Sequence, residues 1–397
     1  MKELSKIAEG VNPSTTLAMD SLAKQMKADG LDVIAFGTGE PDFITPENIR
    51  EAGIAAINAG HTKYTPAAGL PELRRAIADK LKRDFGLDYD FSQIVTASGA
   101  KHNVYIALRA LLNPGDEVIL PAPYWVSYTE MITICGGAPV VLEANEESGF
   151  KINAAQLEAA VTEKTKCFIL NNPSNPTGML YTKQELEALA EVCKKHDLYV
   201  VADEIYSSLV YDGKEFFSFA SLSLDAHERT ILISGVSKSY AMTGWRLGFS
   251  ASNQKLAKMM SSYLSHSTGG PATMTQLAAL EAITGPQDAV EAMRKIFEDR
   301  RNYLVESVNK IDGVSCIMPD GAFYVMMNIT GLIGKTLGGR KINNDDDFAM
   351  VFLEKALVAV VPCSGFGMKN FVRWTYATSM ENIKEGLARL EKFLNEC

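Results

Sequence analysis

A lysine and an arginine stand close together in the stretch SGVSKSYAMTGWRLG, residues 234–248. The amine of Lys238 can form a Schiff base with an aldehyde if its surroundings keep it partly unprotonated, and the small neighbouring side chains let a flat molecule approach. The guanidinium of Arg246 is planar and permanently charged, which suits a phosphate ester. The pair predicts a site for a molecule with an aldehyde and a phosphate. Without its surrounding string, such a pair is more often an exposed lysine and a structural arginine.

A carboxylate ends the apolar run Leu198–Asp203. Burying it at the end of a strand costs free energy unless it is paired, and the N–H of a protonated pyridine ring would be a suitable partner. That pairing makes the ring an electron sink. Tyr206, a few residues later, could reach a phenolic oxygen on the same ring. A helix N-cap for Asp203 and a core position for Tyr206 are the alternatives.

Two short loops follow other strand-like runs. Residues 171–178, NNPSNPTG, form a tight loop in which the amide of Asn175 could donate to the ring oxygen. Gly99 and Ala100 stand where a helix begins, so their backbone N–H groups could bind a phosphate. Each string taken alone is more typical of an ordinary turn.

A tryptophan and a second arginine complete the candidate residues. Trp125, in PYWVSY (residues 123–128), could stack on a flat cofactor or belong to the core. Arg373 lies in an apolar strand-like run and needs a partner there. A substrate carboxylate held bidentately and a structural salt bridge are equally good candidates for that partner.

Composition excludes several classes of function. The chain has 397 residues, 47% hydrophobic and 22% charged, with a net charge of −9 and a pI near 5.3. This acidic balance argues against a nucleic-acid partner. None of the six cysteines forms a C-x-x-C pair or a zinc-like spacing, so we expect no metal. The start lacks a signal peptide and no apolar run could span a bilayer, so we expect a cytoplasmic protein without a membrane partner.

Short β-branched runs alternate with helical patterns through the middle of the chain, which predicts βα units and a mostly parallel sheet covered by helices on both faces. The expected strands are Gln93–Ser98, Glu117–Pro121, Pro139–Leu142, Cys167–Asn171, Leu198–Asp203, Thr230–Ser234 and Leu247–Ala251. Ligands of such sheets bind beyond the carboxyl ends of the strands, where most of the candidate residues stand.

The pattern changes after about residue 285, where a long charged helix precedes strands at 323–327, 358–361 and 371–374 and a final helix after Ser379. We therefore expect three parts. Residues 46–285 form a large cofactor-binding α/β domain with a seven-stranded sheet, and residues 286–397 form a smaller α+β domain. Residues 1–45 form an N-terminal arm and part of the small domain.

Taken together, these strings resemble the class I aminotransferases of fold type I, which use pyridoxal phosphate, over essentially the whole chain. The strings GTGEPDF (residues 37–43) and DGAFY (320–324) belong to the same resemblance. Within the class the chain is most similar to the bacterial aspartate aminotransferases of subgroup Iβ. That closer match is carried by PSTT (13–16), KY (63–64), PYWVSY (123–128), AMTGWR (241–246) and YATS (376–379).

The resemblance implies roles around the cofactor. Lys238 would form its Schiff base and move the substrate proton, Asp203 would pair with the ring nitrogen, and Trp125 would stack on the ring. Asn175 and Tyr206 would bind the ring oxygen. The residues implied for the phosphate end are Gly99, Ala100, Lys101, Arg246, one of the hydroxyls of Ser234 and Ser237, and Tyr64 of a partner chain, because the family forms homodimers with shared active sites.

The resemblance also implies how amino-acid and 2-oxo-acid substrates bind. Arg373, with Gly39 and Asn175, would hold the α-carboxylate. Lys101 takes the distal carboxylate in subgroup Iβ, and Thr15 could add a polar contact. The implied reaction is a ping-pong exchange of aspartate and 2-oxoglutarate for oxaloacetate and glutamate. An aromatic, neutral or prephenate aminotransferase and, less favoured, a C–S lyase are the alternatives.

Overall fold

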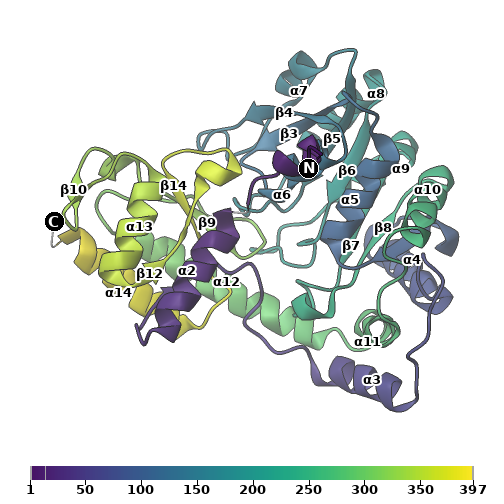
Figure 1. The fold of residues 1–397 in the computed structure, drawn as a ribbon, viewed down its shortest axis with the longest axis horizontal. Coiled ribbons are helices and arrows are strands. Elements are labelled where there is room, and N and C mark those ends of the chain that lie inside the picture. Colours follow the sequence, from purple (N-terminus) through teal and green to yellow (C-terminus); the bar gives the residue numbers. More distant parts are fainter. Residues whose placement is uncertain (1, 14, 396–397) are drawn as a thin grey trace.

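The computed structural model describes residues 2–13 and 15–395, and its larger part is built on a seven-stranded sheet (Figure 1). The strand order is β2-β8-β7-β6-β5-β3-β4, with only β8 antiparallel to its neighbours. All seven expected strands are confirmed, and no end differs from the expected one by more than two residues. Their bounds are β2 Ile94–Ala97, β3 Glu117–Ala122, β4 Ala138–Glu143, β5 Thr165–Asn171, β6 Tyr199–Asp203, β7 Thr230–Gly235 and β8 Gly248–Ala251.

Alternate side chains of the central strands enter cores on opposite faces of the sheet, as the pleat requires. In β6, Val201 packs on one face, whereas Val200 and Ala202 pack on the other. The first face is covered by α5 (Ala100–Leu111), α6 (Ser127–Ile134) and α10 (Gln254–Ser265). The second is covered by α4 (Pro71–Phe85), α7 (Ala154–Ala160), α8 (Lys183–Lys195), α9 (Leu224–Arg229) and α11 (Thr273–Thr284), with α3 (Glu47–Asn58) packed outside α11. The predicted α/β sheet between helices is confirmed.

The C-terminal part has its own core around a three-stranded antiparallel sheet, β13 (Val361–Pro362), β14 (Phe371–Thr375) and β9 (Tyr324–Asn328). Its helices are α12 (Asp288–Val308), α13 (Asp345–Ala356) and α14 (Met380–Asn395), and β10 (Thr336–Leu337) pairs with β11 (Arg340–Lys341). The single strand expected over 358–361 is instead two strands in two sheets. This happens because β12 (Val358–Ala359) pairs with β1 (Ile34–Ala35), whereas β13 pairs with β14.

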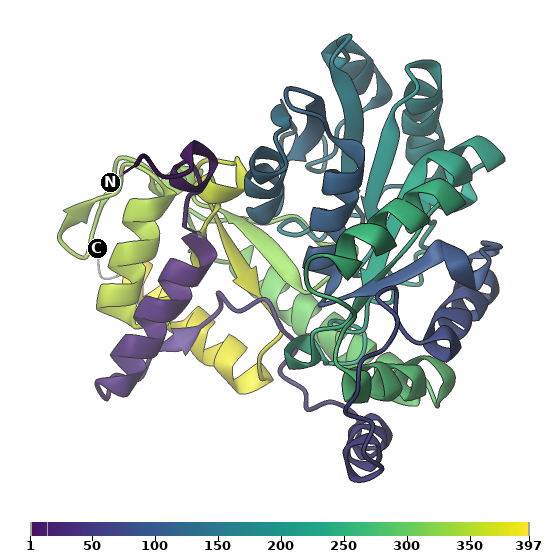
Figure 2. The same cartoon turned by 45° about the vertical axis from the view of Figure 1, so that its right-hand side comes forward.

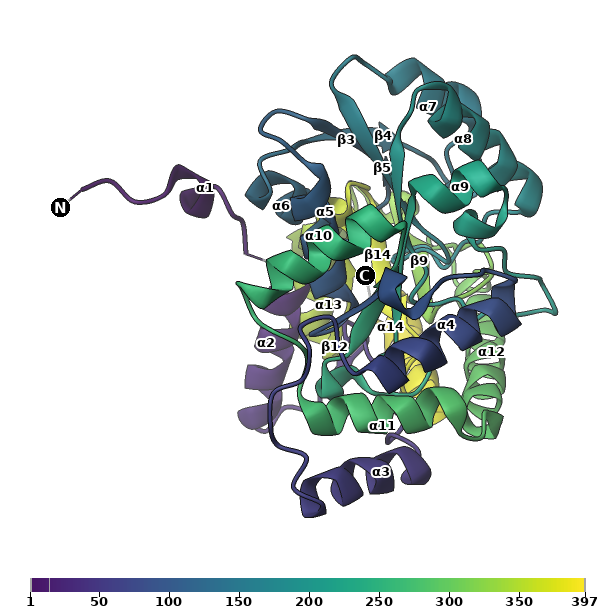
Figure 3. The same ribbon diagram turned by 90° about the vertical axis from the view of Figure 1, so that its right-hand side faces the viewer.

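The N-terminal segment belongs spatially to the C-terminal part. The parallel pairing of β1 with β12 joins them, and α2 (Thr15–Ala28) packs beside β12 and β13 (Figure 2). The residues before α2, which include the short α1 (Lys6–Glu9), project from the side of the molecule (Figure 3). Across the described ranges, we find no helix with the length and apolar character needed to cross a membrane.

Candidate active site

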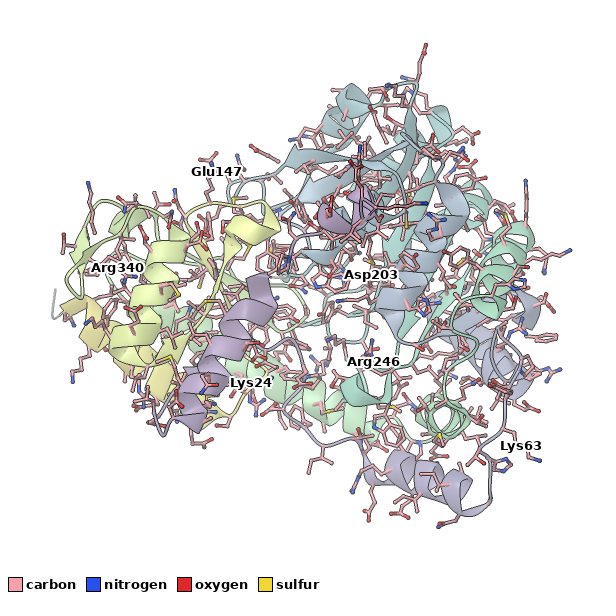
Figure 4. The ribbon with its side chains drawn as sticks, in the orientation of Figure 1. Lys24, Lys63, Glu147, Asp203, Arg246 and Arg340 are labelled. Atoms are coloured by element: carbon pink, nitrogen blue, oxygen red, sulfur yellow. The ribbon has the colours of Figure 1, made fainter. Side chains whose placement is uncertain are left out.

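A cavity of about 400 Å³ lies at the carboxyl ends of the parallel strands, a size typical of sites for small ligands. Both parts of the molecule contribute, since its lining includes Asp203 at the end of β6 and Arg373 from β14. Figure 4 shows Asp203 and Arg246 in the region between the sheet and α2. Lys24, also labelled there, is a residue of α2. Most of the sequence-predicted residues meet here: Gly39, Ala100, Lys101, Trp125, Asn175, Asp203, Tyr206, Ser237, Lys238, Arg246 and Arg373.

Lys238 lies just beyond the end of β7, with its amine directed into the cavity. Its Nζ donates a hydrogen bond to the carbonyl oxygen of Gly39 at 2.5 Å. Burial lowers the pKa of Lys238 to about 8, against the opposing attraction of Glu40. A useful fraction of the amine is therefore unprotonated near neutral pH, which is the state that attacks a carbonyl carbon.

This lowered pKa predicts how the reaction of Lys238 with an aldehyde depends on pH. Only the unprotonated amine reacts, so the rate of Schiff-base formation with added pyridoxal phosphate should rise about tenfold per pH unit below 8 and level off above it. Stopped-flow absorbance of cofactor-free protein between pH 6 and pH 10 measures this. A rate that keeps rising towards the ordinary lysine pKa near 10.5 would contradict it.

Asp203 is a buried carboxylate without a cationic partner among the ion pairs of the described chain. Its Oδ2 accepts a hydrogen bond from the hydroxyl of Tyr128 at 2.7 Å, and its Oδ1 accepts one from the backbone N–H of Ile205 at 3.3 Å. Burial raises the pKa of Asp203, whereas these hydrogen bonds and the charge of Lys238 lower it. A cationic N–H in the cavity would give this carboxylate the partner it lacks.

Two polar groups stand near Asp203 on the cavity wall. The Oδ1 of Asn175 accepts a hydrogen bond from Arg373 at 2.9 Å, which orients its Nδ2 as the remaining donor. The hydroxyl oxygen of Tyr206 lies 3.0 Å from that of Tyr324. Burial raises the pKa of Tyr206 well above its ordinary value, so its hydroxyl stays protonated and can donate.

The start of α5 and Arg246 form a second end of the site. Gly99 caps α5 with a φ of 89°, and a Cβ placed there would lie 2.3 Å from a guanidinium nitrogen of Arg246. Only glycine allows this approach. Arg246 donates to the carbonyl oxygens of Thr243 at 2.9 Å and Ser98 at 3.2 Å, and no carboxylate of the described residues neutralises it. A helix N-terminus beside an unpaired guanidinium can bind an anion such as a phosphate.

The two candidate serines have different surroundings. Ser237 lines the cavity, whereas Ser234 lines a separate small pocket between the sheet and the helices α4 and α11. There its hydroxyl donates to the carbonyl oxygen of Glu204 at 3.5 Å. This is not the position that we expected for a phosphate ligand. The hydroxyl of Ser237 is the one within the cavity.

Arg373 is a buried cation, 3% exposed, whose visible partners are neutral. It donates to the Oδ1 of Asn175 at 2.9 Å and to the carbonyl oxygen of Gly37 at 2.8 Å, and its buried Nε has no partner in the described chain. Its guanidinium packs on the rings of Tyr324 at 4.4 Å and Phe366 at 5.0 Å. A charge buried this way is stabilised by an anion, and the cavity gives that anion access.

A second lysine, Lys101, lines the cavity. The Nζ of Lys101 is 4.7 Å from the centroid of the Trp125 ring, and burial followed by repulsion from Arg246 lowers the pKa of Lys101. Tyr64 is fully exposed and does not line the cavity of this chain. Thr15 is the first residue of α2, and its side chain lies outside the described part of the structure.

Sequence reasoning missed two tyrosines of the site. Tyr128 binds Asp203, and Tyr324 binds Tyr206 and packs on Arg373. Tyr128 lies in the first turn of α6 and follows Trp125, which precedes the helix, by three residues; their ring centroids are 5.3 Å apart. That spacing was the available signal for Tyr128, and the signal for Tyr324 was its place at the end of the string DGAFY.

Comparison with known proteins agrees with this geometry. A family model described as aminotransferase class I and II matches residues 31–390. An aspartate aminotransferase of Bacillus sp. (strain YM-2) is 47% identical over 395 residues, covering 99% of this chain and 100% of the relative. An aspartate/prephenate aminotransferase of Cereibacter sphaeroides is 47% identical over 395 residues, covering 99% of each chain.

Solved structures agree in fold over the same length. The aspartate aminotransferase of Rhizobium meliloti has a TM-score of 0.96 at 41% identity, covering 100% of this chain and 99% of that one. The Thermus thermophilus aspartate aminotransferase with maleate has a TM-score of 0.93 at 39% identity, and the match covers 99% of this chain and 100% of that one. Since the family match spans the segments that carry Lys238, Asp203 and Arg373, the chain belongs to the class I and II aminotransferases.

Proposed function

We propose that this aminotransferase uses pyridoxal phosphate and exchanges aspartate and 2-oxoglutarate for oxaloacetate and glutamate. The observation that carries the proposal is Arg373, a buried cation without an anionic partner that faces the same cavity as the amine of Lys238. An amino acid brings the carboxylate that this arginine lacks and the amine that the reaction transfers.

The residues of the cavity fit the cofactor. The carboxylate of Asp203 would pair with the ring nitrogen, and the amide of Asn175 and hydroxyl of Tyr206 would hold the ring oxygen. The N-terminus of α5 and Arg246 would hold the phosphate, with Ser237 as a further donor. Bound pyridoxal phosphate supplies an aldehyde conjugated to an electron sink, through which an amino group is exchanged.

The chain's own groups would then position the substrate and move its proton. Arg373 binds the α-carboxylate, which fixes the substrate amine near Lys238. The amine of Lys238, with its pKa near 8, can accept a proton from the substrate Cα and return it, because its proton affinity is close to the operating pH. Trp125 covers one side of the cavity and excludes water there.

Preference for dicarboxylates rests on Lys101. Its amine has no carboxylate partner among the ion pairs of the described chain, and it lines the same cavity as Arg373. The named relatives support this choice, and the Thermus thermophilus structure holds maleate, itself a dicarboxylate. Prephenate also carries two carboxylates, and the Cereibacter sphaeroides relative is named for it, which makes an aspartate/prephenate aminotransferase the second candidate.

A homodimer with shared active sites and a cytoplasmic location complete the proposal. The dimer is supported by the apolar side chains that the single chain exposes on and beside α3, where Ile44, Ile54 and Ile57 are 79%, 48% and 55% exposed. Tyr64, at the phosphate of the partner chain, would lie in this same interface.

A panel of amino donors tests the proposal. Purified protein loaded with pyridoxal phosphate is mixed with single amino acids, and absorbance follows the conversion to the pyridoxamine form. Rapid conversion with aspartate and glutamate, and slow conversion with alanine and phenylalanine, is the expected result. Conversion mainly with aromatic or neutral donors would remove the aspartate assignment, and release of pyruvate or ammonia without pyridoxamine would indicate a lyase.

Replacing Lys101 by alanine should remove the dicarboxylate preference. Loss of one charged hydrogen bond predicts a fall of about 10- to 100-fold in kcat/KM for aspartate, with little change for alanine. Lys24→Ala is the matched control, because Lys24 lines the same cavity but is already paired with Asp20 at 2.7 Å. An unchanged ratio of aspartate to alanine activity in Lys101→Ala would show that another group sets the preference.

A further inference from the structure

Two buried tyrosine hydroxyls meet where the two parts of the molecule face each other across the site. Tyr206 follows β6 of the large sheet, and Tyr324 begins β9 of the small one. Their hydroxyl oxygens are 3.0 Å apart, and both side chains are nearly inaccessible to solvent. No other hydrogen bond of the Tyr324 hydroxyl is found within the described chain, so this contact is its principal interaction.

The surroundings hold Tyr324 in this position. A Cβ on Gly39 would lie 3.0 Å from its hydroxyl oxygen, so the glycine makes room for the hydroxyl. The guanidinium of Arg373 lies over its ring, 4.4 Å from the centroid. The ring of Tyr324 therefore packs on Arg373, whereas its hydroxyl contacts the hydroxyl of Tyr206.

We propose that Tyr324 is a positioning residue that donates its hydrogen to Tyr206 and so reserves the hydrogen of Tyr206 for the cofactor's ring oxygen. This inference rests on the proposed function. Each hydroxyl carries one hydrogen, so Tyr206 can donate to the ring oxygen only if the hydrogen shared between the two hydroxyls comes from Tyr324. Hydrogen bonds in such a chain strengthen one another, which increases the stabilisation of negative charge on the ring oxygen.

The consequence appears in the titration of the bound cofactor. A hydrogen bond to the ring oxygen stabilises the form in which the nitrogen joined to Lys238 is unprotonated, because that form leaves negative charge on the oxygen. Weakening the hydrogen bond to the ring oxygen therefore raises the apparent pKa of the nitrogen that joins the cofactor to Lys238. The other charged groups around the two tyrosines are Arg373, Asp203 and Glu40, and none of them is altered by a Tyr→Phe change.

The test is an absorbance titration of the cofactor-loaded protein in four forms: wild type, Tyr324→Phe, Tyr206→Phe and the double variant. Tyr324→Phe should raise the apparent pKa by about half a unit, roughly a threefold change in the proton equilibrium, and Tyr206→Phe should raise it further. In the double variant the shift should equal that of Tyr206→Phe alone, because Tyr324 acts only through Tyr206. The dissociation constant of maleate should differ less than twofold between Tyr324→Phe and wild type, since the aromatic ring that packs on Arg373 is retained.

Tyr376→Phe controls for the loss of a buried hydroxyl, because the hydroxyl of Tyr376 donates to the carbonyl oxygens of Gly321 and Ala322 and Tyr376 does not line the cavity. It should not shift the titration. An unshifted titration in Tyr324→Phe, or shifts that add in the double variant, would overturn the inference while the proposed function stands. A wild-type protein without any pyridoxal absorbance would overturn both.

Discussion

Replacing Lys238 by alanine should lower the rate of transamination by at least about 10⁴-fold. Proton transfer by a positioned side chain alone contributes up to about that factor, and Lys238 is also the proposed nucleophile for the cofactor aldehyde. Its environment supports both roles, because burial lowers its pKa to about 8 and its Nζ is fixed by the carbonyl oxygen of Gly39. Single-turnover absorbance with aspartate measures the loss on protein loaded with the cofactor.

Two variants make this result specific to the amine. Lys238→Arg keeps the positive charge but cannot form a Schiff base, so it should be as inactive as the alanine variant. Lys255→Ala removes an exposed lysine of α10 and should leave the rate unchanged. Reduction with borohydride followed by mass spectrometry should find the cofactor attached to wild-type protein and absent from both Lys238 variants. Retained transamination in Lys238→Ala would show that another group moves the proton.

The large sheet could be predicted closely because its strands carry their own signal. A strand buried on both faces reads as a continuous apolar run, and β5, β6 and β7 show this pattern. The strand expected over 358–361 was wrong in one respect, because the partner of β12 comes from β1 near the N-terminus. No local pattern indicates a pairing between segments so distant in the sequence. The domain boundaries at residues 45 and 285 stay a prediction.

Much of the site could be predicted because parallel strands bring their carboxyl ends to one edge. Asp203 ends β6 and Lys238 follows β7, and both line the cavity. The choice between Ser234 and Ser237 could not be made from the sequence, since it depends on where β7 ends: Ser234 lies within the strand and lines another pocket, whereas Ser237 lies beyond its end and lines the cavity. Tyr324 was missed because its hydrogen bond joins two segments 118 residues apart.

Arg373→Ala should lower kcat/KM for aspartate by about 30- to 4,000-fold. Truncating one partner of a buried, hydrogen-bonded charge pair costs about 2–5 kcal/mol, and each 1.4 kcal/mol is a factor of ten. Arg373→Lys should recover only part of the loss, because an ammonium cannot bind a carboxylate bidentately. Arg340→Ala is the control, since Arg340 is a partly exposed arginine of the same C-terminal part that pairs with Glu354 and lies far from the cavity (Figure 4).

The same variant separates a substrate-binding arginine from a structural one. Without an anion, Arg373 is a buried charge whose Nε has no partner. Its removal should therefore lower the free energy of unfolding only slightly. A dicarboxylate such as maleate should stabilise wild-type protein in proportion to its binding, by about 2.7 kcal/mol at a hundred times its dissociation constant, and should hardly stabilise Arg373→Ala. Thermal unfolding with and without maleate measures both effects. If Arg373 instead served the fold, its removal would lower the free energy of unfolding without maleate, and the stabilisation by maleate would persist.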